Sequence, residues 1–434
     1  KAMSERMISG SFSYQEPLEL FTKLLLNSGY KADFKFGNFL IIPDNKPKPA
    51  QIIQYIDVSG VLTDEQTGEQ LPYATIFLPE PGSYLSSTVN GTFSFRVRET
   101  PAIRIQIQYM GYRPVDTTLV VTGNRLTVSC KLKPRQMELA PIQVKQNRVQ
   151  MIDQNKDASH STVNPVGFVN LPSMGENDIF RTVQLLPGVG YAEGSSGLNI
   201  RGGTADQNLI LFDGFTLYNL DHFFGTFSSV NPSVVKDIQI LKGGFDARYG
   251  ERLSGIVDIT GKTGNKYKPR FNAGLNLISG TLETELPLSE KLTLVAAARR
   301  SYADIYKSFL VHDLVENKME DAGSALQSGN SIMQLQPGYY FYDYNGKLTY
   351  SKNENEKMSV SVFGGKDFLS SAGEGRNRQT YSSTTDKNNW VNYGFSYSWI
   401  KQWHKKFFSG LQIGYSGYLN DYQNETTVNS RSEE

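Results

Sequence analysis

The residues most suggestive of chemistry lie in Gly197–Phe215, GLNIRGGTADQNLILFDGF, where an Arg-Gly-Gly segment precedes an apolar run ending in Asp-Gly. A catalytic loop, a phosphate cradle and a packed structural unit are the three interpretations to separate. The nearby sequence GIVDITGKT ends like a phosphate-binding loop, but Ile256 stands where that loop requires glycine. The sequence GVGYAEG lacks dinucleotide spacing and follows a predicted helix rather than a strand.

The cysteine and histidine content of the chain gives little support for a metal site or a catalytic nucleophile. The chain has one cysteine, Cys130, which excludes an intrachain disulfide and a Cys-based zinc site. The four histidines are scattered, and His222 is by type more often packed or solvated than ligand-binding. Because no Ser/His/Asp or Cys/His constellation can be assembled, we expect neither an enzyme nor a bound cofactor or metal.

Composition indicates several mainly β domains. The 434 residues carry 44 basic and 43 acidic side chains, which gives no basic field for nucleic acid. Aromatic residues make up 12% of the chain and there are 39 glycines, a mixture that favours half-exposed strands. No run of eighteen apolar residues predicts a transmembrane helix.

The elements divide into successive domains. Residues 1–45 predict a small βαββ domain, and residues 56–134 a β-sandwich in which IRIQIQY alternates apolar and polar residues. We expect YLSSTVNG within the sandwich to be a solvated loop. Residues 135–150 form a linker, and residues 151–267 a glycine-rich α+β unit. In that unit NDIFRTVQLLPGV predicts a short helix with Ile179, Val183 and Leu186 on one face.

Residues 268–434 alternate as transmembrane β-strands do. In NYGFSYSW the large residues Tyr393, Phe395, Tyr397 and Trp399 share one face, and small or polar residues share the other. Short turns alternate with long polar segments at about 303–337 and 370–389. About seven strands fit after Phe271. A standard barrel closes with an even number, so we expect the barrel to be incomplete in this chain.

Three parts of the chain resemble known domains. DIFRTVQLLPGVG, LNIRGGTADQNLILFDGFTLYN and FGTFSSVNPSVVKDIQILKGGFDARYGERLSGIVDITGKTGN resemble the plug of TonB-dependent outer-membrane transporters. VSGVLTDEQTGEQLPYATIFL and the strands after it resemble the carboxypeptidase regulatory-like domain that precedes the plug in Bacteroidetes members, with Asn90 where aspartate is usual. FSYQEPLELFTKLLLNSGYKADFKFGNFLIIP resembles the secretin and TonB short N-terminal domain.

The resemblance implies a 22-stranded transmembrane antiparallel β-barrel filled by the plug, in the cell outer membrane with the N-terminal domains in the periplasm. It implies as partners the periplasmic C-terminal domain of TonB, outer-membrane lipids and an unidentified small-molecule or polymer substrate. Other outer-membrane proteins or lipoproteins are further possible partners. A TonB box is expected at Leu139, Ala140, Pro141, Ile142, Gln143 and Val144. The alternative is that this segment pairs with the preceding domain.

The resemblance also assigns roles inside the plug. Arg201 is expected to be a buried or half-buried charge that faces acidic residues of the barrel wall. LNIRGG and NLILFDG are expected to be neighbouring strands, with a tight path at Gly202 and Gly203 and a turn at Asp213-Gly214. Outside the plug, Arg299 and Arg300 with Tyr302, at the upper end of a barrel strand, are expected to meet either lipopolysaccharide phosphates or the plug. The substrate-facing candidates are Tyr191, Tyr218, Asn219, His222 and Phe223.

The function that this implies is import of a nutrient such as a siderophore, glycan, peptide or vitamin B12-like solute, driven by the inner-membrane proton gradient. Two alternatives stay open. One is a structural, plugged-barrel subunit of a larger outer-membrane assembly or secretion complex. The other is a signalling receptor that acts on a periplasmic anti-sigma regulator through residues 1–45.

Overall fold

The computed structural model divides the chain into two compact units, Lys1–Gln54 and Tyr55–Glu434. It describes residues 21–22, 25, 30–35, 38–43, 55–121, 123, 125–135, 152–154, 160–163, 178–191, 197–222, 225, 227–245, 247–276, 278–306, 336–376, 380–404 and 407–430. Among these residues, no helix is both long and apolar enough to span a membrane.

In the first unit, two strands pair as a hairpin. Strand β1 (Tyr30–Lys35) lies antiparallel to β2 (Asn38–Pro43), with Lys35 opposite Asn38 at the turn. They are the last two strands of the predicted βαββ domain. The first strand of that prediction lies outside the described residues.

The predicted sandwich is confirmed as two packed sheets. One sheet has the order β6-β3-β9 and the other β5-β4-β7-β8. The strands are β3 (Tyr55–Asp64), β4 (Thr75–Leu78), β5 (Ser83–Ser86), β6 (Thr92–Arg98), β7 (Ala102–Gln108), β8 (Val115–Val120) and β9 (Arg125–Leu132). Ile103, Ile105 and Ile107 of the alternating segment enter the apolar core between the sheets. The YLSS segment, predicted as a loop, instead forms β5, because it pairs in register with β4.

The central unit follows, with a six-stranded sheet of order β10-β11-β18-β19-β14-β15. Its strands are β10 (Ile152–Gln154), β11 (His160–Val163), β14 (Leu209–Phe212), β15 (Phe215–Thr216), β18 (Val235–Leu241) and β19 (Ile256–Gly261). The predicted helix is α2 (Ile179–Gln184), which Asp178 caps by accepting a hydrogen bond from the Arg181 amide. Its apolar face is buried as predicted.

Two short pairs of strands complete the central unit. Strand β12 (Val189–Tyr191) pairs with β13 (Leu198–Ile200), and β16 (Asp221–His222) pairs with β17 (Phe227–Ser228). The expectation that LNIRGG and NLILFDG form neighbouring strands is wrong, because β13 and β14 belong to different sheets. What joins them is the Asn208 side chain, which donates a hydrogen bond to the Leu198 carbonyl.

In the last part of the chain, the described residues form an antiparallel sheet whose seven strands follow one another in sequence order. They are β20 (Arg270–Leu275), β21 (Ser279–Ser289), β22 (Leu292–Ser301), β23 (Gln336–Asn353), β24 (Glu356–Arg376), β25 (Thr380–His404) and β26 (Phe407–Ser430). The long loop predicted at 370–389 is wrong, because β24 and β25 stay paired as far as Arg376 and Tyr381. The alternation of large and small residues stops there, which hid the extension from sequence analysis.

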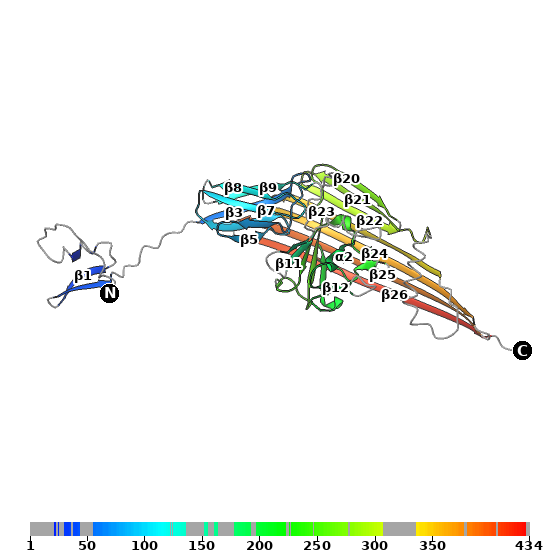
Figure 1. The fold of residues 1–434 in the computed structure, drawn as a ribbon. Helices are drawn as coiled ribbons and strands as arrows, with labels where there is room; N and C mark the ends of the chain where they lie inside the picture. Colours follow the sequence, from blue (N-terminus) through cyan, green and yellow to red (C-terminus); the bar gives the residue numbers. More distant parts are fainter. Residues whose placement is uncertain are drawn as a thin grey trace, which may run out of the picture. The chain divides into compact units, whose positions relative to one another are not determined.

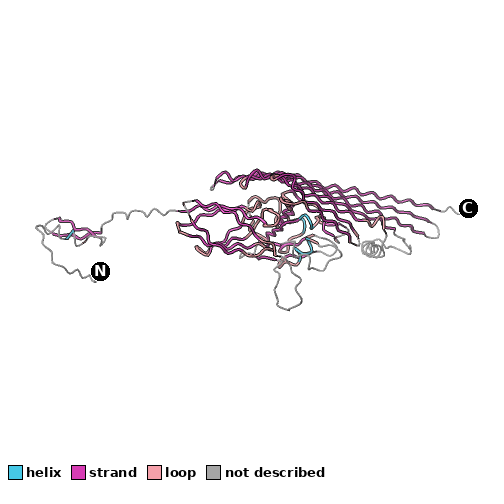
Figure 2. Tube along the Cα trace, turned by 90° about the horizontal axis from the view of Figure 1, so that it is seen from above, coloured by secondary structure: helices cyan, strands magenta, loops and turns pink. Residues whose placement is uncertain are grey.

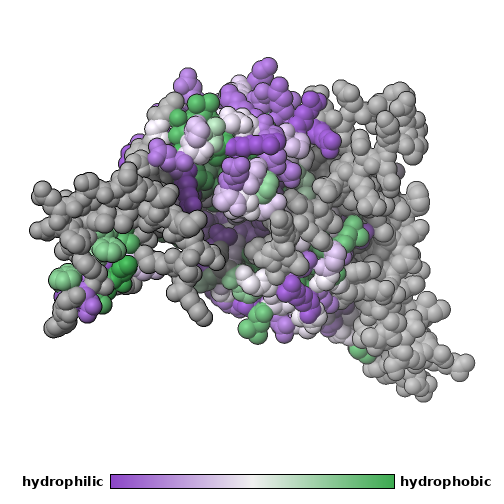
Figure 3. Space-filling model, turned by 60° about the vertical axis from the view of Figure 1, so that its left-hand side comes forward, coloured by the Kyte–Doolittle hydropathy of each residue, from purple (hydrophilic) through white to green (hydrophobic). Residues whose placement is uncertain are grey.

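The central unit packs against one face of this curved sheet, and the sandwich lies at the end where β23 and β24 turn (Figure 1). Seen from above, the long strands run side by side past the central unit (Figure 2). Asn392, Gly394 and Ser396 of β25 are buried, while Phe395 between them is 41% exposed. The polar face therefore meets the central unit, as the alternation predicts. The described residues on the face turned forward in Figure 3 are mostly hydrophilic.

Candidate functional site

The Asp213-Gly214 pair forms the predicted turn between β14 and β15, with φ angles of 47° and 88°. The Asp213 carboxylate accepts hydrogen bonds from the Gly261 amide at 3.0 Å and from the Ser361 hydroxyl at 2.8 Å. It also pairs with the Lys347 ammonium at 2.6 Å. Lys347 and Ser361 belong to β23 and β24, so this turn fastens the central unit to the seven-stranded sheet. The opening question is thereby answered in favour of a packed structural unit.

Glycines of the sheet let the same turn approach closely. A Cβ atom at Gly394 would lie 2.2 Å from the Phe215 ring, and one at Gly414 would lie 2.6 Å from the Gly214 carbonyl oxygen. At the rim of this contact the Thr216 amide donates a hydrogen bond to the Ser416 hydroxyl, with a length of 2.8 Å. Only glycine at these two strand positions leaves room for the turn.

A second contact centres on His222, whose side chain is 1% exposed. Its Nδ1 lies 2.8 Å from the Asp367 carboxylate, and its Nε2 lies 3.3 Å from the Asp343 carboxylate. Burial works against a charge on this ring, but Asp367 and then Asp343 outweigh it and raise the pKa of His222 to about 9. The imidazole is therefore charged at neutral pH and sits between two carboxylates of the sheet.

Arg299 completes this cluster from β22. Its guanidinium pairs with Asp343 at 2.6 Å and donates a hydrogen bond to the Ser228 carbonyl of the central unit at 2.7 Å. The ring of Phe341 stacks on His222 with centroids 4.2 Å apart. Of the two partners weighed for Arg299, the structure brings it to the central unit.

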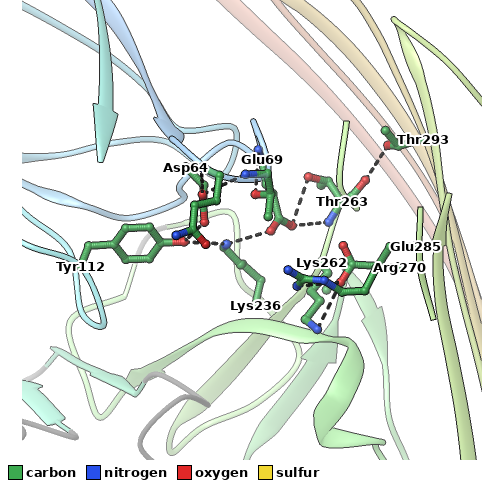
Figure 4. Close-up of polar contacts among 12 residues, drawn as sticks. Asp64, Glu69, Tyr112, Lys236, Lys262, Thr263, Arg270, Glu285 and Thr293 are labelled. Carbon is green, nitrogen blue, oxygen red and sulfur yellow. Dashed lines mark hydrogen bonds and ion pairs between the residues drawn. The ribbon is translucent and has the colours of Figure 1, made fainter. Parts of the chain in front are cut away.

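The sandwich is tied to the central unit by a buried ion pair (Figure 4). The Lys236 ammonium of β18 lies 2.8 Å from the Glu69 carboxylate of the sandwich. Tyr112, also in the sandwich, receives a 3.3 Å hydrogen bond from Lys236 and donates one to Asp64. Lys236 of the central unit thus contacts the Glu69 carboxylate of the sandwich directly, and the Asp64 carboxylate through Tyr112.

The same Glu69 carboxylate reaches the connection between the central unit and the first long strands. It accepts a 2.5 Å hydrogen bond from the Thr263 amide, and the Thr263 carbonyl in turn accepts one from the Thr293 hydroxyl of β22. Next to it, Lys262 pairs with Glu283 of β21 at 2.9 Å. Sandwich, central unit and sheet therefore meet at residues 262–263 (Figure 4).

Several predicted site residues lie elsewhere than expected. Arg201 is exposed in the described part of the chain, so the expectation of a buried or half-buried charge is wrong. The reason is its place on a surface turn, where it adopts a φ of 50° beside Gly202. Gly203 does need its small size, because a Cβ there would lie 2.4 Å from the Ser254 hydroxyl.

The substrate-facing candidates separate in the structure. Tyr218 is 52% exposed, Asn219 is half-buried, and Tyr191 ends strand β12. His222 is enclosed by the sheet, so its assignment to a substrate-facing surface is wrong. Phe223 and the TonB-box candidate, residues 139–144, lie outside the described residues.

Comparison with known families identifies two of these parts. Residues 157–257 match the TonB-dependent Receptor Plug Domain, and residues 58–144 match the CarboxypepD_reg-like domain. A search of curated proteins gave no match. Within the described residues, no group of three or more His, Cys, Asp or Glu side chains is placed to hold a metal ion.

Solved structures with some likeness include two receptors from Pseudomonas aeruginosa and one transporter from Escherichia coli. The ferric enterobactin receptor PfeA is 13% identical, with 60% of this chain and 45% of that chain covered and a TM-score of 0.35. The siderophore receptor PirA is 18% identical, with 64% and 52% covered and a TM-score of 0.34. The outer membrane transporter YddB is 12% identical, with 61% and 48% covered and a TM-score of 0.33. The chain spans about half the length of these proteins.

Residues 157–257 are therefore a TonB-dependent receptor plug domain seated on long antiparallel strands, with a CarboxypepD_reg-like domain before it. The central unit is this plug domain, and the seven-stranded sheet is the surface against which it packs.

Proposed function

We propose that this chain is part of a TonB-dependent outer-membrane receptor. The receptor binds a solute at the cell surface and imports it after TonB pulls on Leu139–Val144. The observation that supports movement of the plug is the polar character of its fastenings. Besides its apolar contacts, the plug is joined to the strands by the Asp213–Lys347 pair and the His222 contacts with Asp367 and Asp343, whose charged groups can form hydrogen bonds with water when they separate. Binding and movement, rather than catalysis, are the work proposed for these residues.

The proposed energy coupling depends on an extended apolar segment adding to the sheet edge of TonB. Deleting residues 139–144 should therefore abolish binding of the purified receptor to the periplasmic C-terminal domain of TonB, measured by calorimetry. Deleting the same number of residues at 46–51, between the first two predicted domains, should leave that binding intact. Undiminished TonB binding after the first deletion would refute the proposed coupling and favour the scaffold alternative.

A further inference from the structure

A cavity of about 510 Å³ lies where sandwich, plug and barrel strands meet. Tyr73 and Asn90 of the sandwich line one side, and the plug turn at Asp213–Thr216 lines another. The long strands contribute Lys347, Lys357, Gln412 and three serines. The plug also contributes Arg248, Glu251 and Asp258, so the lining carries charges of both signs among mainly apolar groups.

The Lys357 side chain in this cavity is unusual. The residue is only 8% exposed, and its ammonium makes no hydrogen bond or ion pair with any residue in the described ranges. Lys347 and Lys266 act on it as like charges, while Glu69 and Asp213 act as opposite ones. The carboxylates of Glu69 and Asp213 are already paired with Lys236 and with Lys347.

The Lys357 ammonium faces a space that water can fill, but it has no counter-charge in contact with it. An anion in the cavity would supply that counter-charge where solvent screening is weaker than in bulk water. Ser359 and Ser398, which line the cavity from β24 and β25, offer neutral hydroxyl donors for the remaining oxygens of such an anion. The space is large enough for a solute of several heavy atoms as well as water.

We propose that this cavity binds a small oxyanion, a carboxylate or a phosphate, with the Lys357 ammonium as its direct contact and Ser359 and Ser398 as hydrogen-bond donors. The proposal concerns equilibrium binding to the receptor and does not depend on import or on TonB.

The test uses the full chain in detergent and phosphate-free buffer, with inorganic phosphate as the probe. Saturable broadening of the phosphorus NMR line reports binding. Lys357→Met should weaken phosphate affinity by about tenfold or more, as expected for loss of a charged hydrogen bond. Lys352→Met is the matched control. It removes the same charge from an exposed side chain and should leave the affinity unchanged.

Two further measurements keep a folding defect apart from a binding defect. The thermal midpoint of Lys357→Met without phosphate should equal or exceed that of the unaltered chain, since a buried ammonium is replaced by an apolar group. Lys357→Arg keeps the charge and should retain binding. Displacement of phosphate by citrate, but not by chloride at equal ionic strength, would show that carboxylate solutes use the same site.

Absence of saturable broadening in the unaltered chain would overturn the proposal, as would equal broadening in a folded Lys357→Met variant. Either result would leave the plug–TonB mechanism standing, because that mechanism is tested by binding of TonB alone.

Discussion

At the scale of single residues, Asp213 is the most consequential fastening of the plug. Asp213→Asn should lower the free energy of unfolding by about 3 kcal/mol, because it leaves the buried Lys347 ammonium without its counter-charge. Thermal unfolding of the purified receptor in detergent measures this loss. The amide can still accept the Gly261 hydrogen bond, so the effect reports mainly the lost charge.

The matched control is Asp57→Asn in the sandwich, which breaks an exposed pair with Arg96 of similar length, 2.7 Å. Its cost should stay below about 1 kcal/mol, as for surface pairs in general. Equal losses in the two variants would mean that the Asp213 contact is solvated and does not fasten the plug.

Protonation of His222 makes the stability of the contact between the plug and the long strands depend on pH. Its pKa of about 9 lies above the value near 6.5 expected in the unfolded chain. The stabilisation is therefore complete below about pH 6.5 and is lost as pH rises through 9, and it amounts to roughly 3 kcal/mol. The groups that face the ring are Asp367, Asp343, Arg299 and, through Asp367, Tyr339.

This dependence is checked by thermal midpoints at pH 6.5 and 9.5. The unaltered receptor should lose stability between the two values, and His222→Gln should be less stable at pH 6.5 but change little with pH. A parallel decline of both proteins would assign the pH effect to other groups.

The residues of the site were predictable only as far as local sequence determines them. The Asp213-Gly214 turn follows from two residue types that tolerate positive φ. The partners of His222 do not follow, because Asp367 stands 145 residues further along the chain on a different element. The exposure of Arg201 was unpredictable for the same reason, since its surroundings depend on where the turn that carries it lies.

At the scale of elements, glycines in the long strands leave the space that the plug turn occupies. Gly394→Ala should force the Phe215 ring away from β25 and cost about 1–3 kcal/mol, the usual range for overpacking. Gly410→Ala in β26 is the control, because the nearest atoms to a Cβ there lie at 3.8 Å. Protease resistance of the plug in folded receptor measures the effect.

A second substitution assigns the cost to this one contact. Phe215→Ala removes the ring that the new methyl group would strike, so adding it to Gly394→Ala should show a favourable coupling in a double-mutant cycle. Additive losses would place the strain elsewhere in β25.

The strands themselves were largely predictable from alternation, since a period of two places polar residues against the plug along β25. Prediction failed where that pattern stops. Beyond Ser370 the strands run on through polar residues on both faces, and only the pairing of Ser371 with Asp386 and of later residues reveals them. Register is a property of two strands, so one segment read alone does not contain it.

At the scale of the whole molecule, the order of domains followed from the sequence but their docking did not. Glu69 lies in a sandwich connection, and its partners Lys236 and Thr263 lie in the plug and at its exit. No local pattern distinguishes such a glutamate from a solvated one. In the folded receptor Glu69 joins the sandwich to the segment through which the plug connects to the barrel strands. Movement of either domain would therefore stretch these contacts.

Glu69→Gln tests whether the sandwich is held to the plug by this charge. The amide keeps an acceptor for the Thr263 amide but leaves the buried Lys236 ammonium unpaired, at a cost of about 3 kcal/mol. Hydrogen exchange at residues 262–266 should then speed up by roughly a hundredfold at pH 7. Glu65→Gln, which breaks an exposed pair with Lys133 inside the sandwich, should not change that exchange.

The same contact should fail in acid. Burial raises the pKa of Glu69, but Lys236 outweighs it, and the net shift is downward from the ordinary value of 4.5. A lowered pKa stabilises the folded state above the unfolded value and loses that stabilisation as pH falls through the folded value. The unaltered receptor should therefore show the fast exchange of Glu69→Gln once the pH falls through the lowered pKa of Glu69. Exchange that stays slow there, after correction for its intrinsic pH dependence, would mean that apolar packing holds the sandwich in place.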